Sequence, residues 1–238
     1  MESMNTLQIS YEEMLKAGMH FGRKKTVYNP KMEPFVYMVR DGICIIDLLK
    51  TQTQLRTTTD FLKTTIQNGG LILFVSLTKQ STEGIKELAQ SLNMPYVIDR
   101  WIGGTLTNFK VINARVKKLE EMEKTQKAGG YDKYTKKERV VLTKDMAKMT
   151  THFDGLKKLT RMPNVVVVSS LKESALPAHE ARKMGVTVVA ITNTDSDPNS
   201  VEYMIPANDR SKKSVDLILE ALKTELRSVT PKTETTTT

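Results

Sequence analysis

Short apolar runs alternate with amphipathic segments over most of the chain. The runs 71–77 and 164–170 are almost continuously apolar, as expected for strands buried on both faces of a parallel sheet. Each is followed by a segment with apolar residues three and four apart, and then by a further strand, at 96–98 or 186–192. Strands that alternate with helices form βαβ units. We therefore expect an α/β, Rossmann-like (flavodoxin-like) domain of three layers with a mainly parallel sheet.

A hairpin and a helix precede this alternation, and a helix follows it. Residues 35–46 contain two β-rich runs around the Asp-Gly pair at 41–42, which suits a tight turn. The apolar spacing is helical from Asp47 onward, and the Asn-Gly-Gly sequence at 68–70 should end that helix. A last helix is expected to begin near Asn208 and Asp209.

A different pattern interrupts the α/β alternation between residues 107 and 160. Two stretches with apolar residues three and four apart flank the sequence KAGGYDKYTKKE, which has no apolar run. This pattern predicts an inserted antiparallel α-helical coiled-coil hairpin. The expected organisation is a first part of the α/β domain at 1–106, the hairpin at 107–160, a second part at 161–227, and a disordered tail at 228–238.

The positive charge of the chain is concentrated in this insertion. The net charge is +9, and residues 110–161 hold 15 Lys and Arg against 7 Asp and Glu, which is a surplus of eight. A two-helix hairpin leaves most of its surface in water, so it tolerates such a surplus. The charge points to a polyanionic partner. A surface decoration of the α/β domain remains the alternative.

Other features of the composition favour an intracellular globular protein. No segment approaches the ~18 consecutive apolar residues of a membrane helix, and the first residues do not resemble a secretory signal. A single cysteine, Cys44, fits a reducing compartment. We expect a cytoplasmic protein that does not bind a membrane.

Catalytic motifs are missing where an open α/β sheet would carry them. The sequences after the expected strands contain neither G-x-G-x-x-G nor a phosphate-binding loop, and no histidine accompanies a nucleophile in an elbow-like turn. Asp195 and Asp197 could hold Mg²⁺, but an Asp-x-Asp-Pro sequence is more often a turn. We expect no enzyme, cofactor, metal or small-molecule substrate. An α/β enzyme that binds a nucleotide or phosphate ligand stays open as the alternative, as does an adaptor that contacts only proteins.

Two loops combine cations, aromatic rings and glycine. The first, 20–37, contains a basic cluster at 23–25 and an Asn-Pro step at 29–30. The second, 100–109, places Arg100 beside the only tryptophan, Trp101, and is followed by a Gly-Gly pair that permits close backbone approach. Trp101 could equally be a core anchor, the glycine pair a hinge, and His20 a cap of the first helix.

At these residues the chain resembles the universal ribosomal small-subunit protein two family in its bacterial form. The resemblance covers about residues 8–226 and rests on LKAGMHFGRKKTVYNPKMEPFVY, DRWIGGTLTNFK, YDKYTKKE and NTDSDPNSVEYMIPAND. It implies a Rossmann-like domain with an inserted coiled-coil hairpin, bound to small-subunit ribosomal RNA. It also implies neighbouring small-subunit ribosomal proteins as partners, including the mRNA-binding protein one.

The chain departs from the bacterial pattern at three positions. Ser170 and Ala175 stand where many members carry Asp and His, and Asn193 stands where they carry Asp. We therefore predict that the metal coordination of some relatives is absent here.

The expected function is binding without catalysis. Cationic side chains would contact RNA phosphates, with the cluster at 23–25 and Lys31 first and Arg100 second, while aromatic rings could stack on unpaired bases. The residues expected to bind RNA are His20, Arg23, Lys24, Lys25, Tyr28, Asn29, Lys31, Arg100, Trp101, Gly103, Gly104, Thr105 and Asn108.

Overall fold

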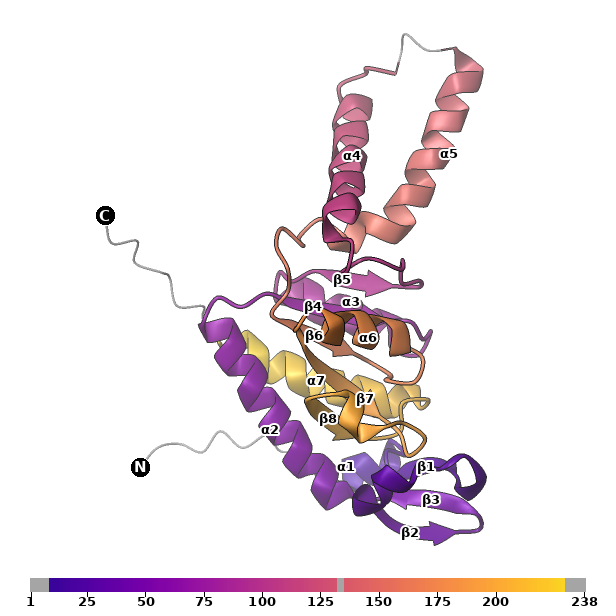
Figure 1. The fold of residues 1–238 in the computed structure, drawn as a ribbon, viewed down its shortest axis with the longest axis vertical. Coiled ribbons are helices and arrows are strands. Elements are labelled where there is room, and N and C mark those ends of the chain that lie inside the picture. The colour runs from indigo at the N-terminus through magenta and orange to yellow at the C-terminus, as the bar shows by residue number, and fades with distance from the viewer. Residues whose placement is uncertain (1–8, 132–134, 230–238) are drawn as a thin grey trace, which may run out of the picture.

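The computed structural model describes residues 9–131 and 135–229, and at its centre lies a five-stranded parallel sheet (Figure 1). The strand order is β5-β4-β6-β7-β8. The strands are β4 (Ile72–Ser76), β5 (Tyr96–Ile98), β6 (Val165–Val168), β7 (Thr187–Thr192) and β8 (Tyr203–Pro206). The four strands predicted from apolar runs are confirmed, and so is the α/β fold class.

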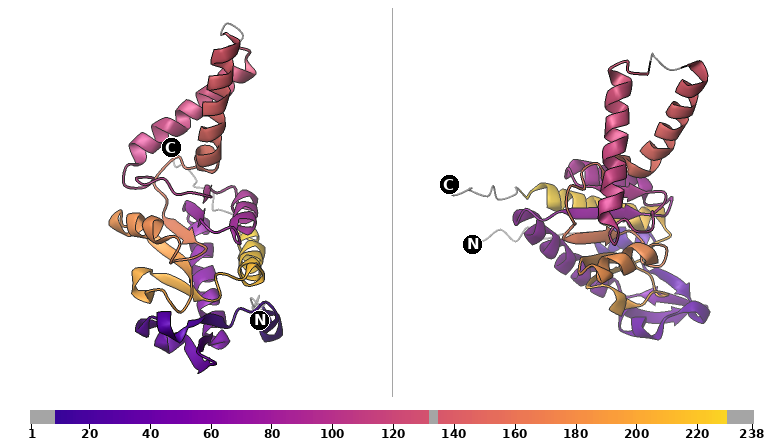
Figure 2. Two further views of the ribbon diagram at one scale, coloured as in Figure 1. Left: turned by 90° about the vertical axis from the view of Figure 1, so that its right-hand side faces the viewer. Right: turned by 45° about the horizontal axis from the view of Figure 1, so that its top comes forward.

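Helices cover both faces of this sheet. One face packs against α2 (Leu48–Gln67), α3 (Thr82–Ser91) and α7 (Lys212–Arg227). The other face packs against α6 (Ala175–Lys183) and the base of the inserted helices (Figure 2). Because both faces are covered, neighbouring residues such as Leu73 and Val166 are fully buried in register.

The structure corrects the prediction at the end of the chain. The segment before the last helix forms strand β8, which ends at Pro206, and α7 begins only at Lys212. The helix starts there because the Ser211 side chain accepts a hydrogen bond from the Ser214 amide. Asn208 and Asp209, taken as the helix start, instead lie in the loop at the carboxyl end of the sheet.

A small antiparallel sheet lies at one end of the molecule. It has the order β1-β3-β2, with β1 (Phe21–Lys24), β2 (Val36–Arg40) and β3 (Ile43–Ile46). The hairpin of β2 and β3 is confirmed, with positive φ at Asp41 and Gly42 in its turn. The strand β1 was not predicted. A short helix, α1 (Tyr11–Lys16), precedes it, and the 3₁₀ turns η1 (Lys25–Val27) and η2 (Pro30–Phe35) lie between β1 and β2.

Two long helices project from the opposite end (Figures 1 and 2). They are α4 (Phe109–Lys127) and α5 (Lys136–Phe153), and a 3₁₀ turn, η3 (Asp154–Leu156), follows them. Both helices were predicted, but burial is confined to their base. Leu119 is the last fully buried residue of α4, and on α5 only Phe153 is buried. Coiled-coil packing between the two helices therefore stays a prediction, as do the domain boundaries.

Part of the sequence interpretation falls outside the described residues. Residues 132–134 of the predicted hairpin turn and 230–238 of the predicted disordered tail belong to this part. Val229, the last described residue, packs against the core cluster under α2, α3 and α7. No helix within the described ranges is long and apolar enough to cross a membrane.

Candidate nucleic-acid interface

The N-terminal basic loop is held against the carboxyl end of the parallel sheet. The Arg23 amide donates a hydrogen bond to Thr194 Oγ1 at 2.8 Å, and the Asn29 amide donates one to the Thr194 carbonyl at 2.9 Å. Gly22 permits this approach, because a Cβ atom there would lie 2.7 Å from Thr194 Cγ2 and 2.8 Å from the Cys44 carbonyl oxygen. The loop is therefore a fixed part of the α/β domain.

Arg23 is not the exposed cation that the sequence suggested. Its side chain is 13% exposed, and its guanidinium lies between two buried carboxylates. Nε is 3.2 Å from Asp195 Oδ2, and Nη2 is 3.1 Å from Asp209 Oδ1. A guanidinium held in this way anchors the loop. Its contact with an RNA phosphate stays a prediction, but the exposure on which that prediction rested is not found.

Asp209 receives further hydrogen bonds from two of the positions at which the chain departs from the bacterial pattern. Ser170 Oγ donates to Oδ2 at 2.7 Å, and Asn193 Nδ2 donates to Oδ1 at 2.9 Å. Asp195 is also paired with Lys172, whose Nζ lies 2.9 Å away. These carboxylates are thus neutralised by the cations of the chain itself, and no three potential metal-ligating side chains converge within residues 9–131 and 135–229.

The crevice between β4 and β6 is where an open α/β sheet with this strand order would bind a ligand. Here it contains serine hydroxyls that bond to one another. Ser81 Oγ lies 2.7 Å from Ser76 Oγ and 2.7 Å from Ser169 Oγ, and all three residues are buried. The polar groups of the crevice are therefore used within the protein.

The remaining cations of the basic loop face solvent. Lys24 and Lys25 are exposed and form no ion pair with any residue that the structure describes. Lys31 Nζ lies 2.7 Å from Asp197 Oδ2, and this hydrogen bond lowers the pKa of the Asp197 carboxyl. Asn29 Oδ1 accepts a hydrogen bond from the Lys31 amide, which orients the loop at the start of η2.

Three rings accompany these cations, with different exposure. Phe21 is 46% exposed and lies beside His20, with ring centroids 4.0 Å apart. His20 does not cap α1, which ends at Lys16 with Ala17 as its C-cap, and burial lowers the pKa of the His20 imidazole. Tyr28 is half-buried, and its hydroxyl points to the Pro30 carbonyl at 3.5 Å. Phe21 therefore offers more open surface for stacking than Tyr28 does.

The second loop is organised around Glu180, a residue of α6 that the sequence interpretation missed. Its carboxylate accepts hydrogen bonds from the Trp101 indole N–H at 3.0 Å and from the Gly104 amide at 2.8 Å. Further bonds come from the Leu106 amide at 3.1 Å and from the amide and hydroxyl of Thr107, both at 3.3 Å. The sequence signal that could have identified this residue is a charged side chain on the apolar face of the helix expected at α6.

Trp101 is 5% exposed and packs in the core, which favours the core-anchor alternative over stacking on RNA bases. Thr105 is buried as well, and its hydroxyl donates to the Ile102 carbonyl at 2.6 Å. Gly104 has a φ of +91°, which the turn before α4 requires.

Other candidates in this loop remain accessible. Arg100, Gly103 and Asn108 are exposed, and Arg100 makes no ion pair with the described part of the chain. Asn108 stands at the N-cap of α4 without a capping hydrogen bond from its side chain.

The two loops lie on the same side of the sheet but are not brought together. The loop at 99–108 follows β5 at one edge, whereas the basic loop packs on the segment that follows β7, three strands away. At ~4.8 Å per strand, this is a separation of about 14 Å across the sheet. Such an arrangement suits an extended polyanion better than a small ligand.

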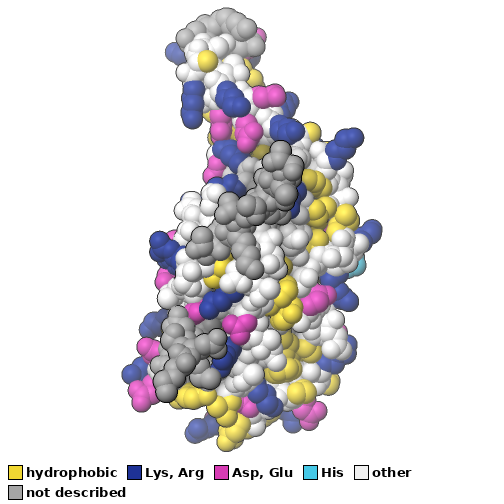
Figure 3. All heavy atoms as spheres, turned by 90° about the vertical axis from the view of Figure 1, so that its left-hand side faces the viewer, with side chains coloured by type: hydrophobic (Ala, Val, Ile, Leu, Met, Phe, Trp, Pro, Cys, Tyr) yellow, Lys and Arg dark blue, Asp and Glu magenta, His cyan; other side chains and the backbone are white. Residues whose placement is uncertain are grey.

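Within the insertion, the surplus of positive charge lies near the base. Residues 110–119 contain four Lys and Arg and no acid, and residues 146–161 contain four against one acid. The outer part, 120–145, is nearly balanced, with seven against six. Figure 3 accordingly shows basic and acidic side chains interspersed on the projecting helices.

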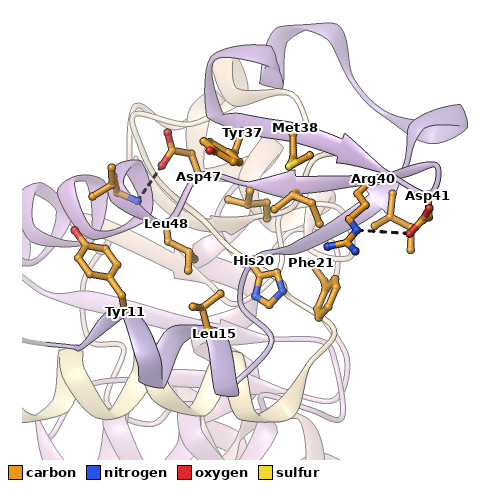
Figure 4. Close-up of a pocket in the computed structure, with 14 residues that line it drawn as sticks. Tyr11, Leu15, His20, Phe21, Tyr37, Met38, Arg40, Asp41, Asp47 and Leu48 are labelled. Carbon is orange, nitrogen blue, oxygen red and sulfur yellow. Dashed lines mark hydrogen bonds and ion pairs between the residues drawn. The ribbon is translucent and has the colours of Figure 1, made fainter.

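A separate apolar surface surrounds the three-stranded sheet. A groove of about 750 Å³ lies between α1, the start of α2 and the β2–β3 hairpin (Figure 4). Tyr37 is 73% exposed and Leu49 62%, which is unusual for such side chains. Figure 3 shows hydrophobic side chains exposed at this end of the molecule. The groove is lined by Tyr11, Leu15, His20, Phe21, Tyr37, Met38, Arg40, Asp41, Ile43, Ile45, Ile46, Asp47, Leu48 and Leu49.

Comparisons with known proteins agree with this arrangement. The family model described as ribosomal protein S2 matches residues 14–228. The small ribosomal subunit protein uS2 of Bifidobacterium animalis subsp. lactis is 42% identical over 212 residues, which cover 89% of this chain and 70% of that protein. The protein uS2 of Amoebophilus asiaticus is 39% identical over 91% of this chain and 69% of its own length. The protein uS2c of Oltmannsiellopsis viridis is 40% identical over 90% of both chains.

Proposed function

Because the chain belongs to the ribosomal protein S2 family, whose members are structural proteins rather than enzymes, we propose that it is a structural constituent of the small ribosomal subunit in the cytoplasm. In this role it binds small-subunit ribosomal RNA and supports subunit assembly and translation. The observation that supports RNA binding best is the accessibility of Lys24 and Lys25 on one loop and of Arg100 on the other, since both loops are held by hydrogen bonds to the α/β domain.

Electrostatics provides the binding energy in this proposal. Each Lys or Arg that neutralises a phosphate releases condensed counterions, so the affinity falls steeply as the salt concentration rises. Lys31 and Asn29 extend the contact surface along the basic loop, and the cations at the base of α4 extend it toward the insertion. These contacts recognise the shape of folded RNA rather than its base sequence.

A salt titration tests the proposal. Binding of the full chain to in vitro transcribed small-subunit ribosomal RNA is measured between low and moderate salt. The double variant Lys24→Ala, Lys25→Ala should make the fall of log K with log[salt] less steep, by up to about 2 in the magnitude of the slope. Lys183→Ala, at the end of α6 and close to the amino end of β7, away from the carboxyl ends of the strands, is the matched control. Equal slopes for the double variant and the wild type would contradict the proposal.

The apolar groove supports a protein partner in addition to RNA. We assign it to a neighbouring small-subunit ribosomal protein, with the mRNA-binding protein one as the first choice. An RNA backbone offers little to a surface built from Tyr37, Met38 and Leu49, whereas an apolar protein segment would cover it. The groove and the cationic loops thus divide the protein and RNA contacts between two surfaces.

The alternative of a nucleotide-binding enzyme is tested by ligand-dependent stabilisation. A ligand that binds only the folded state raises the Tm. The hydroxyls of the β4–β6 crevice bond to one another, so we expect no shift of the Tm with mononucleotides and Mg²⁺. A shift that grows with nucleotide concentration would favour the enzyme class.

A further inference from the structure

Glu180 is a buried carboxylate with five donors and no cationic partner among the described residues. It is 5% exposed, and every donor belongs to the segment 101–107. An ionised carboxylate is costly to bury unless its oxygens are hydrogen-bonded. The loop supplies these bonds, and in return the carboxylate fixes one indole, three backbone amides and one hydroxyl of the loop.

We propose that Glu180 is a positioning residue for RNA binding, which acts by holding Arg100 and the start of α4 in their binding arrangement. This inference rests on the proposed function. Glu180 itself does not reach RNA, because it is buried beneath the loop that it orders.

The connection from Glu180 to Arg100 runs through one residue, Trp101. Arg100 immediately precedes Trp101, whose indole is held by Glu180 Oε1 at 3.0 Å, and the Arg100 amide is fixed by the Ile98 carbonyl at 3.0 Å. With both flanks fixed, the backbone that carries the exposed guanidinium is held in place. Less conformational freedom is then lost when it meets a phosphate.

The connection to the inserted helices is equally short. Glu180 Oε2 holds the amides of Leu106 and Thr107, and α4 begins two residues later at Phe109. Leu106 is fully buried in the cluster that contains the base of α4. The same carboxylate therefore fixes the start of α4, the helix that carries Lys110, Arg115, Lys117 and Lys118.

A double-mutant cycle tests this role with the full chain and in vitro transcribed small-subunit ribosomal RNA. Glu180→Gln should weaken binding about tenfold at moderate salt, as should Arg100→Ala. In the Arg100→Ala background the effect of Glu180→Gln should fall clearly below its effect in the wild type. In the Lys24→Ala background it should remain in full, because Lys24 lies on the other loop.

Three controls separate positioning from loss of fold. Glu173→Gln changes an exposed carboxylate just before α6 and should leave the affinity unchanged. Fluorescence of Trp101, the only tryptophan, reports on the loop, and binding is measured below the Tm of each variant. If Glu180→Gln does not fold, Gly104→Ala disturbs the same loop at a φ of +91° and should give the same coupling with Arg100.

The outcomes are distinct. Coupling to Arg100 without coupling to Lys24 supports the inference. The inference is overturned if Glu180→Gln weakens RNA binding equally in all backgrounds, or if it does not weaken RNA binding at all. It is also overturned if Arg100→Ala leaves the affinity unchanged while Lys24→Ala weakens binding. If neither Arg100→Ala nor Lys24→Ala weakens binding, the proposed RNA binding itself is overturned.

Discussion

Arg23 and Asp209 are 186 positions apart in the sequence, yet Nη2 of one lies 3.1 Å from Oδ1 of the other. This ion pair joins β1, near the start of the chain, to the loop after β8, and Asp195 binds the same guanidinium from the loop after β7. The N-terminal basic loop is therefore attached to the α/β domain by a residue that belongs to its own basic cluster.

Replacing Arg23 should destabilise the protein. Arg23→Ala leaves Asp195 and Asp209 buried, with side chains 3% and 2% exposed and without the guanidinium. Removing one partner of a buried ion pair typically costs about 3–5 kcal/mol of unfolding free energy. Chemical denaturation of the purified protein measures this change.

The neighbouring lysine provides the control for Arg23. Lys24→Ala should change the unfolding free energy by less than about 0.5 kcal/mol, because exposed charges contribute little to stability. Similar losses for the two variants would show that the guanidinium does not anchor the loop.

The stability contributed by Glu180 should depend on pH. Burial raises the pKa of its carboxyl, but the hydrogen bonds from the segment 101–107 together lower it by more, to below the ordinary value of 4.5. For a carboxyl whose folded-state pKa is lowered, the stabilisation is present above the unfolded-state pKa and is lost as the pH falls through the folded-state pKa. The difference in unfolding free energy between the wild type and Glu180→Gln should thus be constant near neutral pH and shrink below about 4.5. A difference that grows on acidification would contradict this assignment.

The outer part of the inserted helices should be dispensable for folding. Replacing residues 120–145 by a short flexible linker leaves Leu119 and the packed end of α5 in place, so the Tm should stay within a few degrees of the wild-type value. RNA affinity should be largely kept, because this part carries little net charge.

A larger deletion should behave differently. Removing 108–160 takes away Phe153, Leu156 and Leu159, which are buried against the sheet, and should lower the Tm strongly. Thermal unfolding of both deletions distinguishes a hairpin rooted in the core from a separate module. Equal Tm values for the two deletion variants would show that the base of the inserted helices contributes nothing to stability.

The apolar groove should be needed for a protein contact and not for folding. Tyr37→Ser with Met38→Ser removes two side chains that are 73% and 47% exposed, so the unfolding free energy should change by less than about 1 kcal/mol. Ribosomal RNA affinity should be unchanged, while co-sedimentation of the mRNA-binding protein one with subunits that carry the variant should fall. Unchanged co-sedimentation would remove that partner from the groove.

The periodic parts of the fold could be predicted from the sequence because the spacing of apolar residues within a strand or helix indicates which of its faces is buried. The runs 71–77 and 164–170 gave strands, and the three-four spacing gave α3, α4 and α5 at nearly the observed positions. β1 and β8 were missed because each has only four residues, and because β1 contains Arg23 and Lys24 while β8 ends in Pro206.

The candidate site was predicted less well, for the same reason. Residue type identified both loops but could not distinguish Arg23 from Lys24, which are adjacent and equally charged. Only the carboxylates of Asp195 and Asp209, brought from 172 and 186 positions away, make one an anchor and leave the other free.

The sequence by itself determined the α/β class, the inserted helices, the excess of positive charge and the two loops that carry it. Those properties depend on local periodicity and on the kind of side chain present. Tertiary structure alone decided that Arg23 and Trp101 face inward, that Glu180 holds the second loop, and that an apolar groove stays open. Burial and hydrogen bonding of a polar group depend on which distant atoms surround it, and that is a property of the folded chain.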